Sequence, residues 1–397
     1  MTDGVYLHIP FCKSRCSYCD FATDVYRDSG AVERYVEALC GEIESEPAAS
    51  AAGQFAVGDS ILSNRPPAYA GGSDVDTIYF GGGTPSLLTV AELGRILDAV
   101  KATFDIADDA EITVEMNPAT VSPEALADYR ELGVNRASFG VQTFNDRDLK
   151  LLARGHDAMD ARNTFKMLRD AGFSNVSFDL IIGLPGQTLA DWEQNLDEAL
   201  TLDPEHLSLY ILEVHAGTPL AEQIRSGRRP VPDEELAAEM YEHLLDRIAA
   251  TEFEQYEISN FAKPGFASRH NTKYWRLEPV HGFGVSAHSF DGRTRSWNIR
   301  DTAGYVAAIE SGVSPEAGRD ILGDEKLAGE RAFLGLRLTD GVSMSEYEAE
   351  TSIDLRQKYA GELARLADAG LIEFAGDRLR LTRRGMLFSN EVFAVFA

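Results

Sequence analysis

Three cysteines near the N-terminus have the side chain and the spacing that a metal centre requires. Cys12, Cys16 and Cys19 lie within eight residues, in the run CKSRCSYC, and only one other cysteine, Cys40, occurs in the chain. Thiolates this close in sequence can hold three corners of one 4Fe–4S cluster from a single loop. Three protein ligands leave the fourth iron open to a small molecule that chelates it through an amino group and a carboxylate. The sequence therefore predicts an iron–sulfur cluster with one open iron.

A zinc site is the alternative reading of the same cysteines. Structural zinc takes four ligands, usually in two separated pairs, and His8 or Asp20 could complete such a set. The spacing of three residues and then two is unusual for zinc, so the pattern favours the cluster. Cys40 lies in a helical pattern, and we expect it to be a small buried residue rather than a ligand.

The elements that must position these cysteines alternate along the first two thirds of the chain. Apolar segments predict strands at residues 5–9, 77–80, 111–115, 137–141, 176–182 and 206–213. Amphipathic segments predict helices at residues 31–46, 90–104, 123–132, 161–171, 189–202 and 234–251. Six such repeats indicate an α/β protein with a parallel sheet and helices outside it. Since a full barrel needs eight units, we expect a partial (β/α)6 barrel.

The rest of the chain divides by composition. The barrel is expected over residues 1–255, with a surface insertion at 47–75 that is rich in Ala, Gly, Ser and Pro and to which no chemistry is assigned. Residues 256–300 form an aromatic-rich connecting region of short strand-like pieces. Residues 301–397 predict a smaller α+β domain in which a helix, a hairpin (371–374 and 379–382) and a last helix resemble a winged helix.

The charge of the chain limits the partners of that domain. Acidic residues number 64 and basic residues 37, which gives a net charge of −27. A general nucleic-acid-binding protein needs a basic surface, so we expect a packing module and no nucleic acid. No signal peptide and no apolar run long enough to span a membrane occur, which predicts a cytoplasmic protein.

Further polar candidates stand where the predicted strands end. In a parallel barrel, ligands bind at the carboxyl ends of the strands. The glycine run Gly81–Gly83, followed by Thr84 and Pro85, comes after the second strand, and glycine permits close approach of the backbone. Glu115 ends the third strand and Gln142 the fourth.

Asp179 stands inside the fifth strand, between apolar residues. A buried carboxylate is costly unless it is paired, so we expect a ligand or a cation beside it. Arg154 is the candidate cation.

The cysteine spacing, with the aromatic Tyr18 before the last cysteine, resembles the radical S-adenosylmethionine superfamily. The preceding run Tyr6–Phe11 narrows the resemblance to the HemN/HemW group, and the resemblance covers almost the whole chain. It implies that S-adenosylmethionine binds the open iron and that the turn Gly183–Gly186 lies near the adenine. By resemblance, the residues that match cofactor positions are Tyr6, Gly82, Gly83, Thr84, Glu115, Gln142, Arg154 and Asp179.

The group has two branches, and three features favour the branch of haem chaperones. Phe21 stands where the other branch, oxygen-independent coproporphyrinogen III oxidase, usually has a fourth cysteine. The chain begins only a short distance before Cys12, whereas the oxidase has a long N-terminal extension. The run His270–Trp275 matches a His-Asn-x-x-Tyr-Trp signature of the chaperone branch.

The resemblance therefore implies a protein that binds haem and transfers it to acceptor proteins, without coproporphyrinogen oxidase activity. The tentative haem-binding residues are His270, Tyr274 and Trp275, with His281 and His288 as rivals. His270 could instead order its loop through hydrogen bonds. A ferredoxin or flavodoxin is the implied electron donor. The alternative function is radical oxidative decarboxylation of coproporphyrinogen III to protoporphyrinogen IX.

Overall fold

The computed structural model describes residues 2–25, 28–46 and 74–397. The expected insertion at 47–75 therefore lies outside the described residues, except for its last two positions. Those two positions belong to a strand that begins earlier than the sequence predicted.

Six parallel strands form the centre of the main sheet, in the order in which they follow along the chain. They are β1 (Asp3–Ile9), β4 (Asp74–Gly82), β5 (Asp105–Met116), β6 (Arg136–Gln142), β7 (Val176–Ile182) and β8 (His206–Ile211). All six correspond to predicted strands, so the partial barrel is confirmed. The predicted bounds were too short for β4 and β5, whereas β8 ends at Ile211 and not at residue 213.

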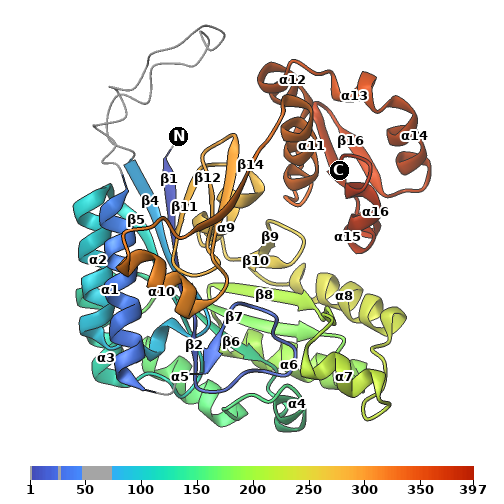
Figure 1. The fold of residues 1–397 in the computed structure, drawn as a ribbon. Helices are drawn as coiled ribbons and strands as arrows, with labels where there is room; N and C mark the ends of the chain where they lie inside the picture. The colour runs from blue at the N-terminus through green and yellow to red at the C-terminus, as the bar shows by residue number, and fades with distance from the viewer. Residues whose placement is uncertain (1, 26–27, 47–73) are drawn as a thin grey trace, which may run out of the picture.

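Helices cover the outside of this sheet (Figure 1). Six were predicted, and they are α1 (Ser29–Ser45), α2 (Val90–Thr103), α3 (Pro123–Glu131), α5 (Ala158–Asp170), α6 (Leu189–Leu202) and α8 (Glu234–Ile248). Two short helices were missed, α4 (Asp146–Leu151) and α7 (Pro219–Arg225), as was the 3-10 turn η1 (Pro85–Leu87). None of the described helices combines the length and hydropathy needed to cross a bilayer.

Each parallel strand buries an outer and an inner face, because successive side chains point to opposite sides. On β1, Val5, Leu7 and Ile9 are fully buried against the helices. On β6 and β7, the rings of Phe139 and Phe178 meet edge to face with their centres 4.7 Å apart. The polar residues on alternate positions therefore face the inside of the barrel.

Shorter strands extend the sheet at both edges. Beside β1 lies β11 (Val280–Phe283), which is parallel to it, followed by the antiparallel strands β12 (His288–Phe290), β13 (Thr294–Asn298) and β14 (Glu316–Ile321). Beside β8 lie β10 (Asn260–Ala262) and β9 (Glu254–Gln255). The region that was expected to hold short strands also contains a helix, α9 (Arg269–Trp275), and α10 (Thr302–Glu310) precedes β14.

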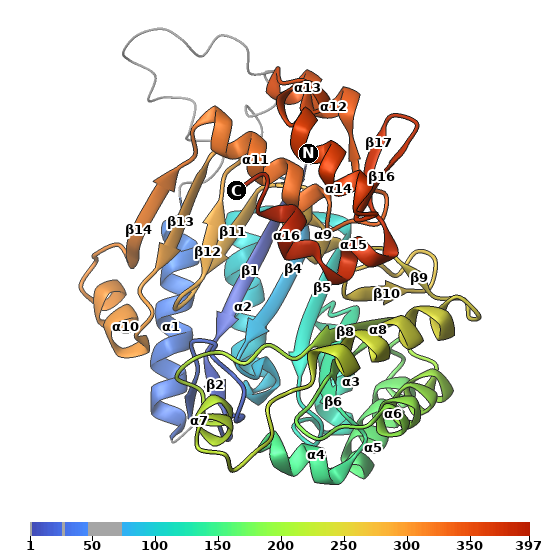
Figure 2. The ribbon, with the colours of Figure 1, turned by 90° about the vertical axis from the view of Figure 1, so that its right-hand side faces the viewer.

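The C-terminal part has its own core around Leu336, Tyr347 and Leu379. Its elements are α11 (Asp324–Gly335), β15 (Val342–Ser343), α12 (Met344–Thr351), α13 (Leu355–Lys358), α14 (Ala360–Asp368), β16 (Ile372–Ala375), β17 (Arg378–Leu381), α15 (Arg383–Leu387) and α16 (Ser389–Phe393). The predicted hairpin is β16 and β17, and Gly376 in its turn has a φ of 62°, which favours glycine. Figure 2 shows these elements at the end of the sheet where β1 and β4 begin.

Candidate functional site

The cysteines lie at the opposite end of the sheet, in a loop that follows β1. Cys12 ends β2 (Phe11–Cys12), which pairs with β3 (Asp24–Val25), and all three cysteines are partly buried. Ser17 fixes the loop, since its side chain donates to the carbonyl of Leu151 at 2.9 Å and its backbone N–H donates to Leu152 at 2.9 Å. The loop is thus held against the end of α4.

Two predicted residues contact the cysteine sulfurs directly. Thr84 Oγ1 donates to Cys12 Sγ at 3.6 Å, and Arg154 Nη1 donates to Cys16 Sγ at 3.4 Å. Burial raises the pKa of the Cys12 thiol to about 11, while the hydrogen bond from Thr84 lowers it. The sequence predictions for Thr84 and Arg154 therefore converge with the cysteines on one place.

Asn117 joins these two residues and was not predicted as a site residue. Its Nδ2 donates to Thr84 Oγ1 at 2.7 Å, and its Oδ1 accepts a short hydrogen bond from Arg154 Nη2. The same Arg154 nitrogen donates to the carbonyl of Gly140 at 2.6 Å. The position of Asn117, just after Glu115 at a strand end, was the signal that could have identified it.

The glycine run lies against β1 so closely that side chains are excluded. A Cβ on Gly83 would lie 2.8 Å from the carbonyl oxygen of Phe11, and one on Gly82 would lie 2.7 Å from the imidazole of His8. Gly82 also has a φ of 108°, a conformation that favours glycine. Its N–H donates to Glu115 Oε2 at 3.2 Å, so the run reaches the next candidate residue.

Glu115 and Tyr79 form a pair inside the barrel. Tyr79 Oη donates to Glu115 Oε1 at 2.7 Å. The pKa of Glu115 is raised to about 7, because burial and the Asp179 carboxylate raise it more than the hydrogen bonds from Tyr79 and Gly82 lower it. Burial also raises the pKa of Asp179, which a hydrogen bond with Ser208 and the nearby charges of Arg136 and Arg154 lower.

Tyr6 and His8 link this pair to the cysteine loop. His8 Nε2 lies 2.9 Å from the carbonyl of Ala22, so this nitrogen carries the proton and Nδ1 accepts from Tyr6 Oη at 3.1 Å. The rings of Tyr6 and Tyr79 are stacked with their centres 6.2 Å apart. Tyr6 therefore lies beside the pair formed by Glu115 and Tyr79.

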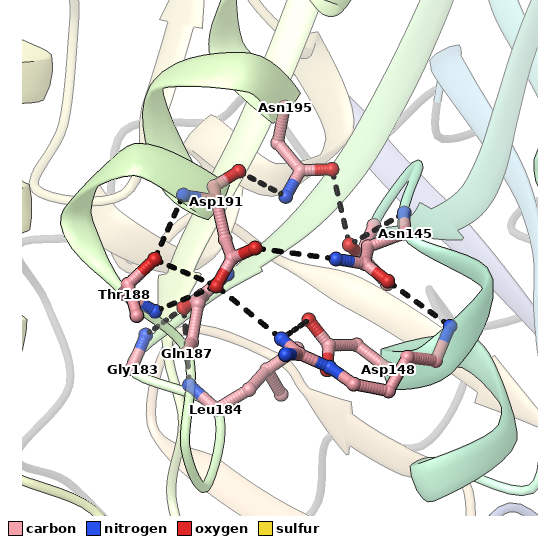
Figure 3. Close-up of polar contacts among 10 residues, drawn as sticks. Asn145, Asp148, Gly183, Leu184, Gln187, Thr188, Asp191 and Asn195 are labelled. Atoms are coloured by element: carbon pink, nitrogen blue, oxygen red, sulfur yellow. Dashed lines mark hydrogen bonds and ion pairs between the residues drawn. The ribbon is translucent and has the colours of Figure 1, made fainter.

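A hydrogen-bond network supports the loops that carry Gln142 and Arg154 (Figure 3). Asn195 Oδ1 on α6 accepts from the hydroxyl of Thr143 at 3.0 Å and from the N–H of Phe144. Asn145 caps α4 and also donates to Asp191. Gln142 directly precedes Thr143, and Arg154 follows the end of α4, so this network holds the start of the segment between the two residues.

Gln142 and the turn Gly183–Gly186 lie beside this network. Gln142 has a φ of 68°, and its amide would lie 2.5 Å from a Cβ on Gly140. Gln187 Oε1 accepts from the N–H of Gly183 at 2.8 Å and of Leu184 at 3.1 Å. The structure thus brings all eight candidate cofactor residues and the three cysteines to the inner face and carboxyl end of the barrel.

Comparisons with known proteins agree with this geometry. Residues 68–199 match the model of the radical SAM superfamily, and residues 323–388 match that of the HemN C-terminal domain. The chain is 38% identical to the heme chaperone HemW of Bacillus subtilis (strain 168) over 99% of this chain and 98% of the relative. It is 32% identical to the heme chaperone HemW of Escherichia coli (strain K12) over 99% of this chain and 97% of the relative.

The chain belongs to the HemW family of radical SAM proteins. A solved structure, that of the coproporphyrinogen III oxidase HemN from Escherichia coli, shares its fold, with a TM-score of 0.83 over 100% of this chain and 90% of the other. The sequence identity to HemN is 23%.

The run His270–Trp275, associated with the HemW branch, does not lie with the cysteines. It forms α9, at the end of the barrel where the strands begin (Figure 2). His270 is 1% exposed, and its ring nitrogens contact Thr77 Oγ1 at 2.9 Å and Tyr274 Oη at 3.0 Å. Its ring stacks on Tyr79 with centres 5.1 Å apart. In this conformation neither ring nitrogen of His270 is free to coordinate iron.

The remaining haem candidates each have other partners. Trp275 packs against the guanidinium of Arg337, whose carbon lies 4.2 Å from the ring centre. His281 contacts the carboxylate of Asp3 at 3.2 Å, and His288 stacks on Trp297 with centres 6.2 Å apart. Haem binding by the candidate residues stays a prediction.

Proposed function

We propose that Cys12, Cys16 and Cys19 hold a 4Fe–4S cluster. The donor set supports this, since three thiols stand in one loop with Arg154 and Thr84 directed at two of their sulfurs. Hydrogen bonds to the sulfurs are among the protein features that tune such clusters. Among the described residues, no three Cys, His, Asp or Glu side chains converge as the ligands of a single ion would, so the proposal depends on the loop and its contacts.

S-adenosylmethionine is the proposed ligand of the open iron, where it supplies the chemistry of a reductively cleavable sulfonium. We propose that the backbone at Gly82 and Gly83, with Thr84, meets its amino group, and that Glu115 accepts hydrogen bonds from its ribose. Gln142, Arg154, Asp179 and Tyr6 complete the site. The inward position of these side chains and the close approach of the glycine run to β1 support this assignment.

The proposed biological function is that of a haem chaperone, which binds haem and transfers it to acceptor proteins in the cytoplasm. The observation that carries this proposal is similarity over nearly the full length to proteins named heme chaperone HemW. A ferredoxin or flavodoxin is the proposed electron donor. Ligation of haem by His270 would require α9 to move, because both ring nitrogens are engaged.

Anaerobic reconstitution of the cluster, followed by two parallel assays, tests the proposal. One assay measures the haem that stays with the protein through gel filtration, and the other measures conversion of coproporphyrinogen III with S-adenosylmethionine and a reductant. We expect haem retention without conversion. Conversion without haem retention would support the oxidase instead, and neither activity with an intact cluster would contradict both.

The cluster is tested separately with a matched pair of variants. Cys16→Ser is expected to lose most of the bound iron and sulfide, because it removes a proposed ligand. Cys40→Ser is the control, since Cys40 lies on α1, away from the loop. Equal iron contents in the two variants would contradict the assignment.

A further inference from the structure

Arg136 is a buried cation to which nothing above gives a role. It is the first residue of β6, and only 1% of its surface is exposed. Its Nε and Nη1 atoms are buried and make no hydrogen bond among the described residues. Burying a guanidinium without partners is costly, so the site must gain something from its charge.

Arg136 stands on the strand that lies between the strands of two carboxylates. On one side, β6 pairs with β5, where Arg136 stands opposite Thr113, two residues before Glu115. On the other side, β6 pairs with β7, where Asp179 stands opposite Gly140. Residues two apart on a strand share a face, so Arg136, Ser138 and Gly140 all face the barrel interior. Arg136 thus lies one level below Glu115, which neighbours Ser138, and two levels below Asp179, on the strand between the two carboxylates.

The two carboxylates need a positive charge there, because they are close enough to oppose each other's ionisation. Arg154, the other cation nearby, already donates to Cys16, Asn117 and Gly140. Arg136 acts on both carboxylates through space and lowers the pKa of each. Among the described residues, no hydrogen bond at Nε or Nη1 directs the charge of Arg136 elsewhere.

Other titratable groups face the same three residues from every neighbouring element. The groups that interact with Arg136, besides the two carboxylates, are Tyr79 on β4, His206 on β8, His270 on α9, and Tyr256, which follows β9. Those that interact with Glu115 or Asp179 are Tyr6, Tyr18, Tyr210 and Tyr274. Burial raises the pKa of each of these tyrosines and lowers that of each histidine, so all of them are neutral near pH 7.

We propose that Arg136 is a positioning residue whose charge allows Glu115 and Asp179 to ionise inside the barrel and so to accept hydrogen bonds from the ligand. It acts through the two carboxylates and does not touch the ligand. The role in ligand binding rests on the proposed function, because it takes S-adenosylmethionine as the ligand. The effect on ionisation does not depend on that ligand.

The direction of the pH effect follows from the charge. Without Arg136, the pKa values of both carboxylates rise, and each is protonated to a higher pH. A protonated carboxyl group accepts hydrogen bonds less well, so ligand affinity is lost at the acid end of the profile first. A shift of one pKa unit corresponds to about a tenfold change in affinity over the affected range.

The experiment measures anaerobic binding of S-adenosylmethionine to the reconstituted protein by equilibrium dialysis, from pH 6 to pH 9. We expect Arg136→Met to move the acid limb of the profile up by about one pH unit, with unchanged cluster content. Arg136→Lys should restore most of the wild-type profile because it keeps the charge. Arg228→Met, at an exposed arginine in the loop after α7, is the control. Superimposable profiles for Arg136→Met and the wild type would overturn the proposal.

A double mutant separates this role from a purely structural one. In a Glu115→Gln background one of the two carboxylates is gone, so the additional effect of Arg136→Met should be smaller than in the wild type. An equal effect in both backgrounds would contradict the proposal. If Arg136→Met does not fold, Arg136→Gln replaces it, since Gln removes the charge but retains hydrogen-bonding groups.

Infrared titration of the protein without ligand tests the ionisation alone. The protonated-carboxyl band that Glu115→Gln removes should titrate at higher pH in Arg136→Met than in the wild type. An unchanged titration would overturn the proposal even if binding changed. Failure of the wild type to bind S-adenosylmethionine would contradict the proposed function and leave this titration as the decisive result for Arg136.

Discussion

Arg154 Nη1 lies 3.4 Å from the sulfur of Cys16, although 138 positions separate the two residues in the chain. The contact joins the segment after α4 to the cysteine loop, and Ser17 adds two hydrogen bonds between the same segments. The geometry of the proposed cluster therefore depends on the loops after β6 as well as on the cysteines.

Replacement of Arg154 by Met is expected to weaken this junction. The variant loses the donors to Cys16, Asn117 and Gly140 together, and buried acceptors left unpaired each cost about 1–3 kcal/mol. Iron and sulfide analysis after anaerobic reconstitution should show a lower cluster content. Lys150→Met, on the exposed side of α4, should reconstitute like the wild type. A full cluster in Arg154→Met would show that the contact is dispensable.

Addition of one methyl group at Gly83 is expected to displace the cysteine loop. Its Cβ would stand 2.8 Å from backbone atoms of Pro10 and Phe11, which cannot rotate away. Overpacking of this kind costs about 1–3 kcal/mol. The midpoint temperature of thermal unfolding and the iron content should both be lower in Gly83→Ala than in the wild type.

The matched control for that variant is Gly361→Ala. Its Cβ meets nothing within 4 Å, and alanine in a helix is favoured by up to about 1 kcal/mol. A decrease in stability equal to that of Gly83→Ala would refute the steric argument.

Acid should destabilise the protein partly through His270. Burial and the nearby charge of Lys273 together lower the pKa of His270 to about 3. Because the unfolded chain takes up this proton near pH 6.5 and the folded protein does not, the contribution to stability is present above that pH. It is lost as the pH falls from about 6.5 towards 3. Denaturant unfolding of His270→Gln should therefore show a shallower loss of stability over this range; a slope equal to that of the wild type would be inconsistent with a buried neutral imidazole.

The network around Asn195 should affect the ligand site without affecting the cluster. Asn195→Leu leaves the N–H of Phe144 and the hydroxyl of Thr143 without their acceptor, at a cost of about 1–3 kcal/mol each. We expect weaker binding of S-adenosylmethionine at normal iron content, because Gln142 directly precedes Thr143 in this loop. Gln194→Leu, one residue away and exposed, is the control. Equal affinities in the two variants would contradict a role of this network in ligand binding.

The sequence predicted the strands and helices that carry long periodic patterns, and it predicted the residues beside the cysteines. Thr84 and Glu115 could be predicted because strand ends in a parallel barrel converge, and Arg154 because the buried Asp179 calls for a cation beside it. Helix α4 was missed because six residues are too short to show a helical period. Helix α9 was missed because its first N–H groups donate to the carboxylate of Glu111 on β5, a partner far away in the sequence.

The role of Arg136 could not be predicted from the sequence for a related reason. From the sequence alone, a single arginine at the start of an apolar strand is expected to be exposed. Arg136 is buried because the assembled barrel surrounds it. His270 was a candidate haem ligand from its motif, with local hydrogen bonding as the alternative, whereas its partners Thr77 and Tyr274 could be identified only once β4 and α9 came together. Burial and long-range partners are properties of the assembled barrel, so local patterns do not contain them.

Transfer of haem to an acceptor tests the central claim most directly. The reconstituted protein is loaded with haem, separated from free haem by gel filtration and mixed anaerobically with an excess of an apo-haem protein, while the absorption spectrum is recorded. We expect the haem spectrum of the loaded protein to be replaced by that of the holo-acceptor, faster than when the haem is supplied bound to albumin. A loaded protein that keeps its haem, or a cluster-bearing protein that never retains haem, would contradict the proposal of a haem chaperone.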